Sequence, residues 1–265
     1  MKGIKLIVGL SVKTTDAGIE FNQRDLIIDA AEYTGQCDAG TERMPYPSGW
    51  SGFTQEDCVT DPEARLILDR FPYPNVVGKI AYVVRCTRYD GLWLVSVLQR
   101  HLKNYGPVMI KMALRMVRFL YTTRATCLIF RRGYPGDLHP LVSMVDASFA
   151  SSDIDGSSHA GSIHFWNGCP IAATSKNQRP VALNTMESEF MGANDCARAA
   201  LWKERLATGF GMKVPLPMPI MEDNTSAIYL SRKPSLNGSN TRHMRVRWHW
   251  LQQQVMDELV VLHHL

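Results

Sequence analysis

Residues 157–175 read SSHAGSIHFWNGCPIAATS, two apolar segments joined by the dipeptide Asn167-Gly168. Asn-Gly suits a tight hairpin turn because both residues adopt positive φ at little cost. The stretch therefore predicts two antiparallel strands. A third apolar segment, Leu141 to Val145, comes just before them and ends at Asp146. Three strands in succession indicate an antiparallel meander at the start of the C-terminal half.

The pattern changes to helical spacing after the meander. Asn184 can cap a helix, and Glu187 three residues later completes a capping-box-like pair. A Pro-rich segment at 215–219 then leads into a short strand that ends at Asp223. The remaining predicted elements are a helix from Thr225, a helix with the apolar stripe Met244, Trp248, Leu251 and Val255, and a last strand at 259–262. This β-β-β-α-β-α-α-β order predicts an α/β fold with a mixed sheet flanked by helices.

The N-terminal half has a different character. Residues 4–21 predict a hairpin, and a short helix follows to Tyr33. The Gly, Pro and Ser content of 34–61 predicts a long loop, and apolar spacing over 74–123 predicts packed helices. We therefore expect two domains, a mainly helical one at 1–138 and the α/β domain at 139–265.

Positive charge is concentrated in one segment of the first half, although the net charge is only +4. No acidic residue lies between Asp90 and Asp137, and the basic residues there are Arg100, Lys103, Lys111, Arg115, Arg118, Arg124, Arg131 and Arg132. Such a segment suits a polyanion such as nucleic acid. A helix with one solvated basic face is the alternative that composition leaves open.

The cysteines and the N-terminus bear on where the protein resides. The six cysteines show no pair at the short spacing of zinc or redox motifs. Lys5 and Gly9 interrupt the apolar start, which makes a poor signal peptide, and no apolar run reaches the length of a membrane span. We expect a cytoplasmic or nuclear protein that is not secreted and does not contact a membrane.

Three carboxylates stand where strands and a helix could bring them together. Asp146 and Asp223 end two predicted strands, and Glu189 lies early in the helix between them. Clustered carboxylates repel one another unless cations bind them, and two Mg²⁺ ions would support phosphodiester hydrolysis. Isolated aspartates at strand ends are common, so the spacing alone also permits a purely structural role.

A family resemblance adds to this pattern. Five of the segments that carry it are Val145–Ala150, Pro170–Gln178, Val181–Phe190, Glu222–Ile228 and Thr241–His249. In this order they resemble the ribonuclease H domain of copia-type LTR retrotransposon polyproteins. The resemblance implies a ribonuclease H-like mixed five-stranded sheet flanked by helices, and an enzyme that cleaves the RNA strand of RNA–DNA hybrids with Mg²⁺ or Mn²⁺. It implies that Asp146, Glu189 and Asp223 are the catalytic metal ligands.

Two positions qualify this expectation. Glu187 is the rival of Glu189 as metal ligand, and we favour Glu189 because Glu187 has a capping role and Phe190 follows Glu189. The family carries a fourth carboxylate where this chain has Arg245. The alternatives are therefore a working or impaired ribonuclease H, a non-catalytic nucleic-acid-binding remnant, and a decayed reading frame without a cellular role.

Further basic residues flank the carboxylates in sequence: Arg232, Lys233, Arg242 and Arg247. They could hold substrate phosphates or form an ordinary exposed charge run. His243 and His249 do not share a helix face, so we expect structural or nucleic-acid contacts from them and no zinc site. The first half more loosely resembles the thumb-like, C-terminal part of the reverse transcriptase in the same polyproteins. Its polymerase aspartates are absent, so the expected partner is an upstream reverse transcriptase region.

Overall fold

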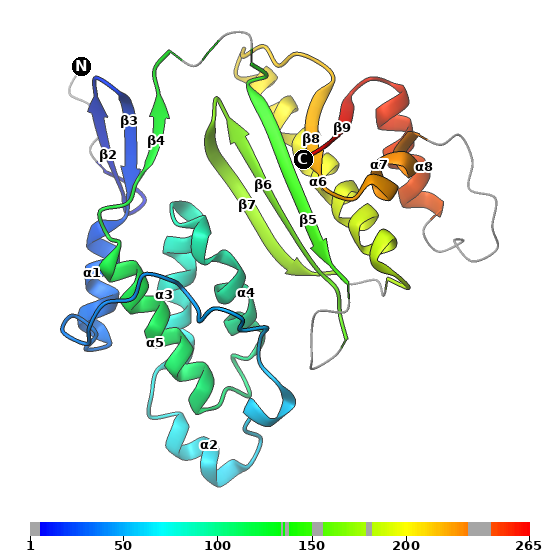
Figure 1. Cartoon of the computed structure of the whole chain (residues 1–265). Helices are drawn as coiled ribbons and strands as arrows, with labels where there is room; N and C mark the ends of the chain where they lie inside the picture. Colours follow the sequence, from blue (N-terminus) through cyan, green and yellow to red (C-terminus); the bar gives the residue numbers. More distant parts are fainter. Residues whose placement is uncertain (1–5, 134, 136–137, 150–155, 179–181, 233–244) are drawn as a thin grey trace. The chain divides into compact units, whose positions relative to one another are not determined.

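The computed structural model describes residues 6–133, 135, 138–149, 156–178, 182–232 and 245–265. Its described residues form two compact units, one ending at Arg132 and one beginning at Gly133 (Figure 1). Each unit has its own sheet. The second unit positions the three carboxylates.

The first unit combines an antiparallel sheet with helices. Its sheet has the order β1-β2-β3-β4, formed by Leu6–Ile7, Leu10–Thr15, Gly18–Asn22 and Leu128–Arg131. The helices are α1 Arg24–Tyr33, α2 Pro62–Leu68, α3 Tyr73–Cys86, α4 Leu92–Arg100 and α5 Pro107–Thr122, with 3₁₀ turns at Gln55–Asp57 and Tyr89–Gly91. The hairpin, α1 and the helices α3 to α5 agree with the sequence pattern, whereas α2 was not expected. Strand β4 was not expected, because its partner β3 lies more than a hundred residues earlier.

Methionines on α5 belong to the core of this unit, as their spacing predicts. Met109, Met112 and Met116 are buried, and so are Val117 and Leu120 on the same helix. Residues three and four positions apart share one face of a helix, so this spacing gives α5 one continuous apolar face.

The second unit contains a mixed five-stranded sheet. Its strands are β5 Leu141–Ser148, β6 His159–Trp166, β7 Cys169–Asn177, β8 Met218–Glu222 and β9 Val260–His264, in the order β7-β6-β5-β8-β9. Strands β5, β6 and β7 form an antiparallel meander, whereas β8 is parallel to both β5 and β9. Asn167 and Gly168 both have positive φ in the turn between β6 and β7. The expected ribonuclease H-like fold class is thus confirmed.

Helix α6, Thr185–Gly209, packs along one face of this sheet (Figure 1). Phe190, Ala193 and Cys196 on α6 are buried. Gly192 allows the close approach, since a Cβ there would lie 3.3 Å from Val145 Cγ2. Helices α7, Thr225–Arg232, and α8, Arg245–Met256, contact each other and α6. The three helices therefore cover the same face of the sheet.

Burial along β5 alternates with each residue. Val145 and Ala147 are buried toward α6, whereas Met144 and Asp146 are exposed. Successive side chains of a strand point to opposite faces of its sheet. Asp146 therefore lies on the face that α6, α7 and α8 leave uncovered.

Candidate metal centre

Asp146 and Asp223 lie at the same level on neighbouring parallel strands. The last paired residues of β5 and β8 are Met144 and Met221, and each aspartate stands two positions beyond its own methionine. Crevices beyond the carboxyl ends of parallel strands are common ligand sites in α/β sheets. Both aspartates are exposed, so the geometry places two accessible carboxylates side by side.

One detail of the sequence prediction was wrong. Asp223 directly follows β8, but Asp146 does not end its strand, because β5 continues to Ser148. The reason is that β5 keeps pairing with β6 as far as Ser148 opposite His159, while its pairing with β8 stops at Met144. Asp146 therefore stands where two paired strands separate.

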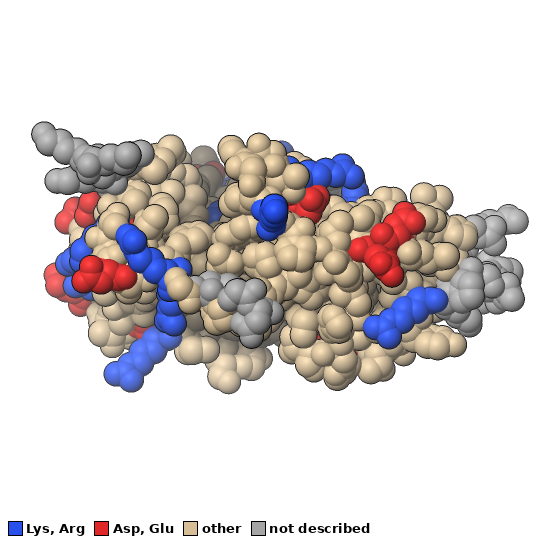
Figure 2. Space-filling model, turned by 90° about the horizontal axis from the view of Figure 1, so that it is seen from above, with Lys and Arg blue, Asp and Glu red and all other residues tan. Residues whose placement is uncertain are grey.

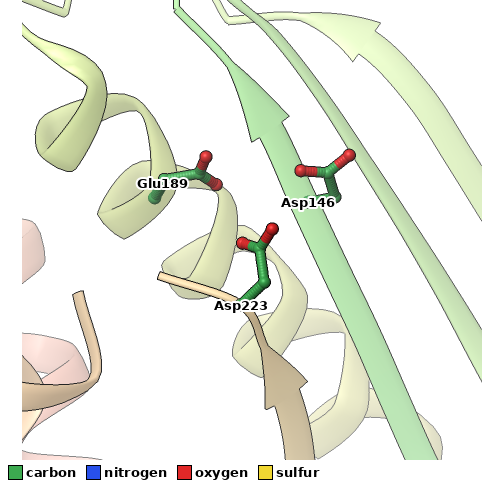
Figure 3. A group of neighbouring side chains, drawn as sticks. All are labelled: Asp146, Glu189 and Asp223. Atoms are coloured by element: carbon green, nitrogen blue, oxygen red, sulfur yellow. The ribbon is translucent and has the colours of Figure 1, made fainter. Parts of the chain in front are cut away.

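Glu189 reaches this point from α6. Phe190 beside it is fully buried and anchors that part of the helix against the sheet. The side chain of Glu189 is only 5% exposed, and its Oε2 accepts a hydrogen bond of 2.8 Å from the backbone N–H of Ala147. Carboxylate oxygens of Asp146, Glu189 and Asp223 lie within 4.8 Å of one another (Figure 3). The structure thus brings together the three carboxylates that the sequence singles out.

Glu187 lies elsewhere. Its Oε2 accepts from the N–H of Leu183 at 2.8 Å, and its own N–H donates to Asn184 Oδ1 at 2.9 Å. The bond from the Glu187 N–H to the N-cap Asn184 is one half of a capping box, while the Glu187 carboxylate accepts from Leu183, the residue before the N-cap. Glu187 therefore caps the start of α6, and Glu189 is the glutamate of the carboxylate group.

Crowding of negative charge disfavours the ionised form of Glu189. Burial is the main cause that raises its pKa to about 7, and the neighbouring Asp146 and Asp223 add to this, while the Ala147 hydrogen bond acts in the opposite direction. No ion pair to Glu189 exists among the described residues. A divalent cation would remove this repulsion.

Glu222 is a fourth carboxyl group that the sequence reasoning did not select. It is the last residue of β8 and is fully buried, with Met218 and Ile220 on the same side of the strand. Burial above all, then Glu189, Asp223 and Asp146, raise its pKa to about 8, against the lowering effect of a hydrogen bond from Asn224 N–H. The period of two from Met218 could have placed Glu222 on the buried face.

The donor set fits a hard divalent cation. Mg²⁺ and Mn²⁺ prefer carboxylate oxygens, and three such groups converge here. Asp146 and Asp223 are exposed, so a cation bound to them could also bind water or substrate. Glu189 is buried, and a hydrogen bond from the Ala147 N–H fixes its carboxylate. The residues alone do not select between Mg²⁺ and Mn²⁺.

The basic residues expected to bind nucleic acid have varied surroundings. Arg100, Lys103 and Lys111 are exposed. Arg115 and Arg118 instead both pair with Glu42, at 2.8 and 3.7 Å. On the face seen in Figure 2, basic and acidic side chains are interspersed and do not gather in one basic area.

The basic residues near α7 and α8 are only partly described. Arg232 donates to the carbonyl oxygen of Leu262 at 2.8 Å, and the carbonyl oxygen of Arg247 accepts from Asn194 Nδ2 at 2.8 Å. His249 is exposed. Lys233, Arg242, His243 and the side chain of Arg245 lie outside the described part of the chain.

Among the described residues, no helix is long and apolar enough to span a membrane.

Comparisons with known proteins identify relatives over most of the chain. No family model matches. The chain is 30% identical over 212 residues to the retrovirus-related Pol polyprotein from transposon TNT 1-94 of Nicotiana tabacum, which covers 80% of the chain and 15% of that protein. It is 25% identical over 259 residues to the Pol polyprotein from transposon RE1 of Arabidopsis thaliana, covering 97% of the chain and 17% of the relative.

The comparison with solved structures also gives a match. The LC11 ribonuclease H1 isolated from compost matches 48% of this chain and 85% of its own, with a TM-score of 0.36 and 8% identity. The present chain spans less than a fifth of the length of either polyprotein. Over most of its length the chain is thus similar to retrovirus-related Pol polyproteins of plant transposons, as expected for a fragment of a copia-type polyprotein, and its second unit has a ribonuclease H-like fold.

Proposed function

We propose that the second unit is a metal-dependent endoribonuclease that hydrolyses the RNA strand of RNA–DNA hybrids. The observation that carries the proposal is the convergence of Asp146, Glu189 and Asp223 at the point where β5 and β8 separate. Carboxylates at such short distances, one of them buried, repel one another without a cation. The similarity to retrovirus-related Pol polyproteins supports the proposed substrate class.

Each residue of this site has a separate task. Asp146 and Asp223 present exposed oxygens on the face of the sheet that α6, α7 and α8 leave uncovered, where a nucleic acid could approach. Glu189 closes the site from the helix side, and the Ala147 N–H fixes the position of its carboxylate. Bound Mg²⁺ or Mn²⁺ would supply an activated water and would neutralise charge on the scissile phosphate.

Contacts outside the carboxylates would hold the substrate. The exposed Arg100, Lys103 and Lys111 on the first unit are suited to phosphate contacts, which supply most of the affinity for nucleic acids and make it dependent on salt. We further propose that residues 1–138 are the thumb- or connection-like end of a reverse transcriptase, and that an upstream polymerase region is the natural partner. The site of action would be the cytoplasm or nucleus.

A non-catalytic nucleic-acid-binding remnant is the second candidate. Arg245 favours it, because the family carries its fourth carboxylate at that position. A guanidinium near a divalent cation weakens cation binding. Such a remnant would bind hybrids without turning them over.

Cleavage of an end-labelled RNA–DNA hybrid separates the two candidates. We expect the whole chain to cut the RNA strand with Mg²⁺ or Mn²⁺, and expect EDTA or Asp146→Asn to abolish cutting. Asp195→Asn is the matched control, since Asp195 is a carboxylate of α6 that pairs with Lys176 at 3.0 Å. Hybrid binding without metal-dependent cutting would contradict the enzymatic proposal and support the remnant.

A further inference from the structure

Glu222 holds a carboxyl oxygen for which the described fold provides no partner. The side chain is 0% exposed at the end of β8. Its Oε1 accepts a hydrogen bond of 3.1 Å from the N–H of Asn224. Its Oε2 has no hydrogen-bond partner among the residues that the structure describes. Half of this buried carboxyl group is thus unsatisfied.

A buried carboxyl oxygen without a hydrogen bond lowers the free energy of unfolding, so its presence calls for an explanation. Most buried polar atoms in proteins are hydrogen-bonded, and each exception calls for an explanation, for which a catalytic role and a bound ion are two of the possible grounds. No ion pair to Glu222 occurs among the described residues. Glu222 ends β8 and directly precedes Asp223, one of the three converging carboxylates. Glu222 therefore adjoins the carboxylate group.

Capping of α7 does not explain this glutamate. Asn224 performs that task, because its Oδ1 accepts from the N–H of Ala227 at 3.0 Å. The contact that Glu222 makes to the Asn224 N–H needs only one neutral acceptor, which glutamine would also supply. A local structural role thus explains the hydrogen bond to Glu222 Oε1 but does not explain Glu222 Oε2.

We propose that Glu222 is a positioning residue of the metal site, and that its Oε2 supports the bound cation from outside the three direct ligands. This inference rests on the proposed function. Glu222 is not within the group of converging oxygens, which is why we assign it an outer contact. Such outer groups typically contribute a factor of 10 to 100 to metal affinity. Glu222 would thereby supply a fourth carboxylate in a chain that has Arg245 at the family's position.

The test compares Glu222→Gln with Glu204→Gln in the whole chain. Glutamine keeps an acceptor for the Asn224 N–H and removes one negative charge. Glu204→Gln removes the same charge near the far end of α6, where Glu204 accepts from Thr208 Oγ1. Mn²⁺ affinity is measured by titration calorimetry, and urea unfolding is followed in EDTA.

We expect Glu222→Gln to weaken Mn²⁺ binding about 10- to 100-fold and not to lower the urea midpoint of the metal-free protein. Equal Mn²⁺ affinities for Glu222→Gln and Glu204→Gln would overturn the inference. A lowered midpoint with normal Mn²⁺ affinity would overturn it as well, since that result describes a purely structural residue.

A measurement on the unmodified chain covers the case in which the Gln variant does not fold. With ¹³C-labelled glutamate, the Glu222 carboxyl resonance should shift during a Mg²⁺ titration at the same midpoint as that of Glu189. A Glu222 resonance that stays constant while Glu189 shifts would refute the inference alone. Absence of any Mg²⁺ or Mn²⁺ binding, in the unmodified chain as in Asp146→Asn, would refute the proposed function itself.

Discussion

Replacing Glu189 by glutamine should stabilise the metal-free protein and destroy its response to Mg²⁺. The carboxyl group is buried beside Asp146 and Asp223, which raises its pKa from 4.5 to about 7. At 1.36 kcal/mol for each pKa unit, ionising Glu189 in the folded state costs about 3 kcal/mol more than in the unfolded chain. Glutamine is never ionised, so it avoids this cost and can still accept from the Ala147 N–H.

The sign of the pH dependence follows from the raised pKa. A carboxyl group with a raised pKa binds more protons in the folded state, so the free energy of unfolding decreases as pH rises from about 4.5 to about 7. The advantage of Glu189→Gln should therefore be below about 1 kcal/mol near pH 5 and about 3 kcal/mol near pH 8. Mg²⁺ at about 1,000 times its Kd should reverse the order, since it then stabilises the protein that binds it by about 4.1 kcal/mol.

Urea unfolding followed by tryptophan fluorescence measures the free energy of unfolding of both proteins. The measurement is made at pH 5 and pH 8, in EDTA and in Mg²⁺. Glu187→Gln is the control, because Glu187 is buried two residues away on α6 and glutamine can also accept from the Leu183 N–H. It should not change the effect of Mg²⁺. The reasoning fails if Glu189→Gln is no more stable than the unmodified chain at pH 8 in EDTA, or gains as much from Mg²⁺.

Three further predictions concern packing, substrate binding and charge. Gly192→Val should destabilise the second unit by about 1 to 3 kcal/mol in urea unfolding, because its side chain would clash with Val145; unchanged stability would show that α6 does not pack so closely. Lys103→Glu with Lys111→Glu should weaken hybrid binding and flatten its dependence on salt, whereas an unaltered slope would remove both lysines from the interface. Arg245→Asp should tighten Mg²⁺ binding in titration calorimetry, since it replaces a repelling charge by an attracting one; equal affinities would exclude Arg245 from influence on the site.

The sequence was most informative where local signals decide the structure. Asn167-Gly168 specified a hairpin, and Asn184 with Glu187 specified the start of α6, because these residues form their contacts with near neighbours in the chain. The same local logic separated Glu187 from Glu189. Local chemistry sufficed there because a capping glutamate satisfies backbone groups within four residues of itself.

Features that depend on distant partners were not predictable. Strand β4 forms only because β3, from the opposite end of the unit, supplies its partners. Glu42 lies in a loop whose sequence suggested no chemistry, yet it pairs with Arg115 and Arg118 more than seventy residues later. The alternation along β8 could have placed Glu222 on the buried face, but the level of the end of β8 beside Asp146 required the pairing of β8 with β5.

The central claim is that Asp146, Glu189 and Asp223 together hold a divalent cation. Crystals of the whole chain soaked in Mn²⁺ test it most directly, because anomalous scattering locates the ion without reference to activity. We expect an anomalous peak at about 2.1 to 2.5 Å from a carboxylate oxygen of each of the three residues, and no such peak in Asp146→Asn. Density for well-ordered carboxylates without a peak between them, at a Mn²⁺ concentration that populates sites elsewhere on the protein, would contradict the account.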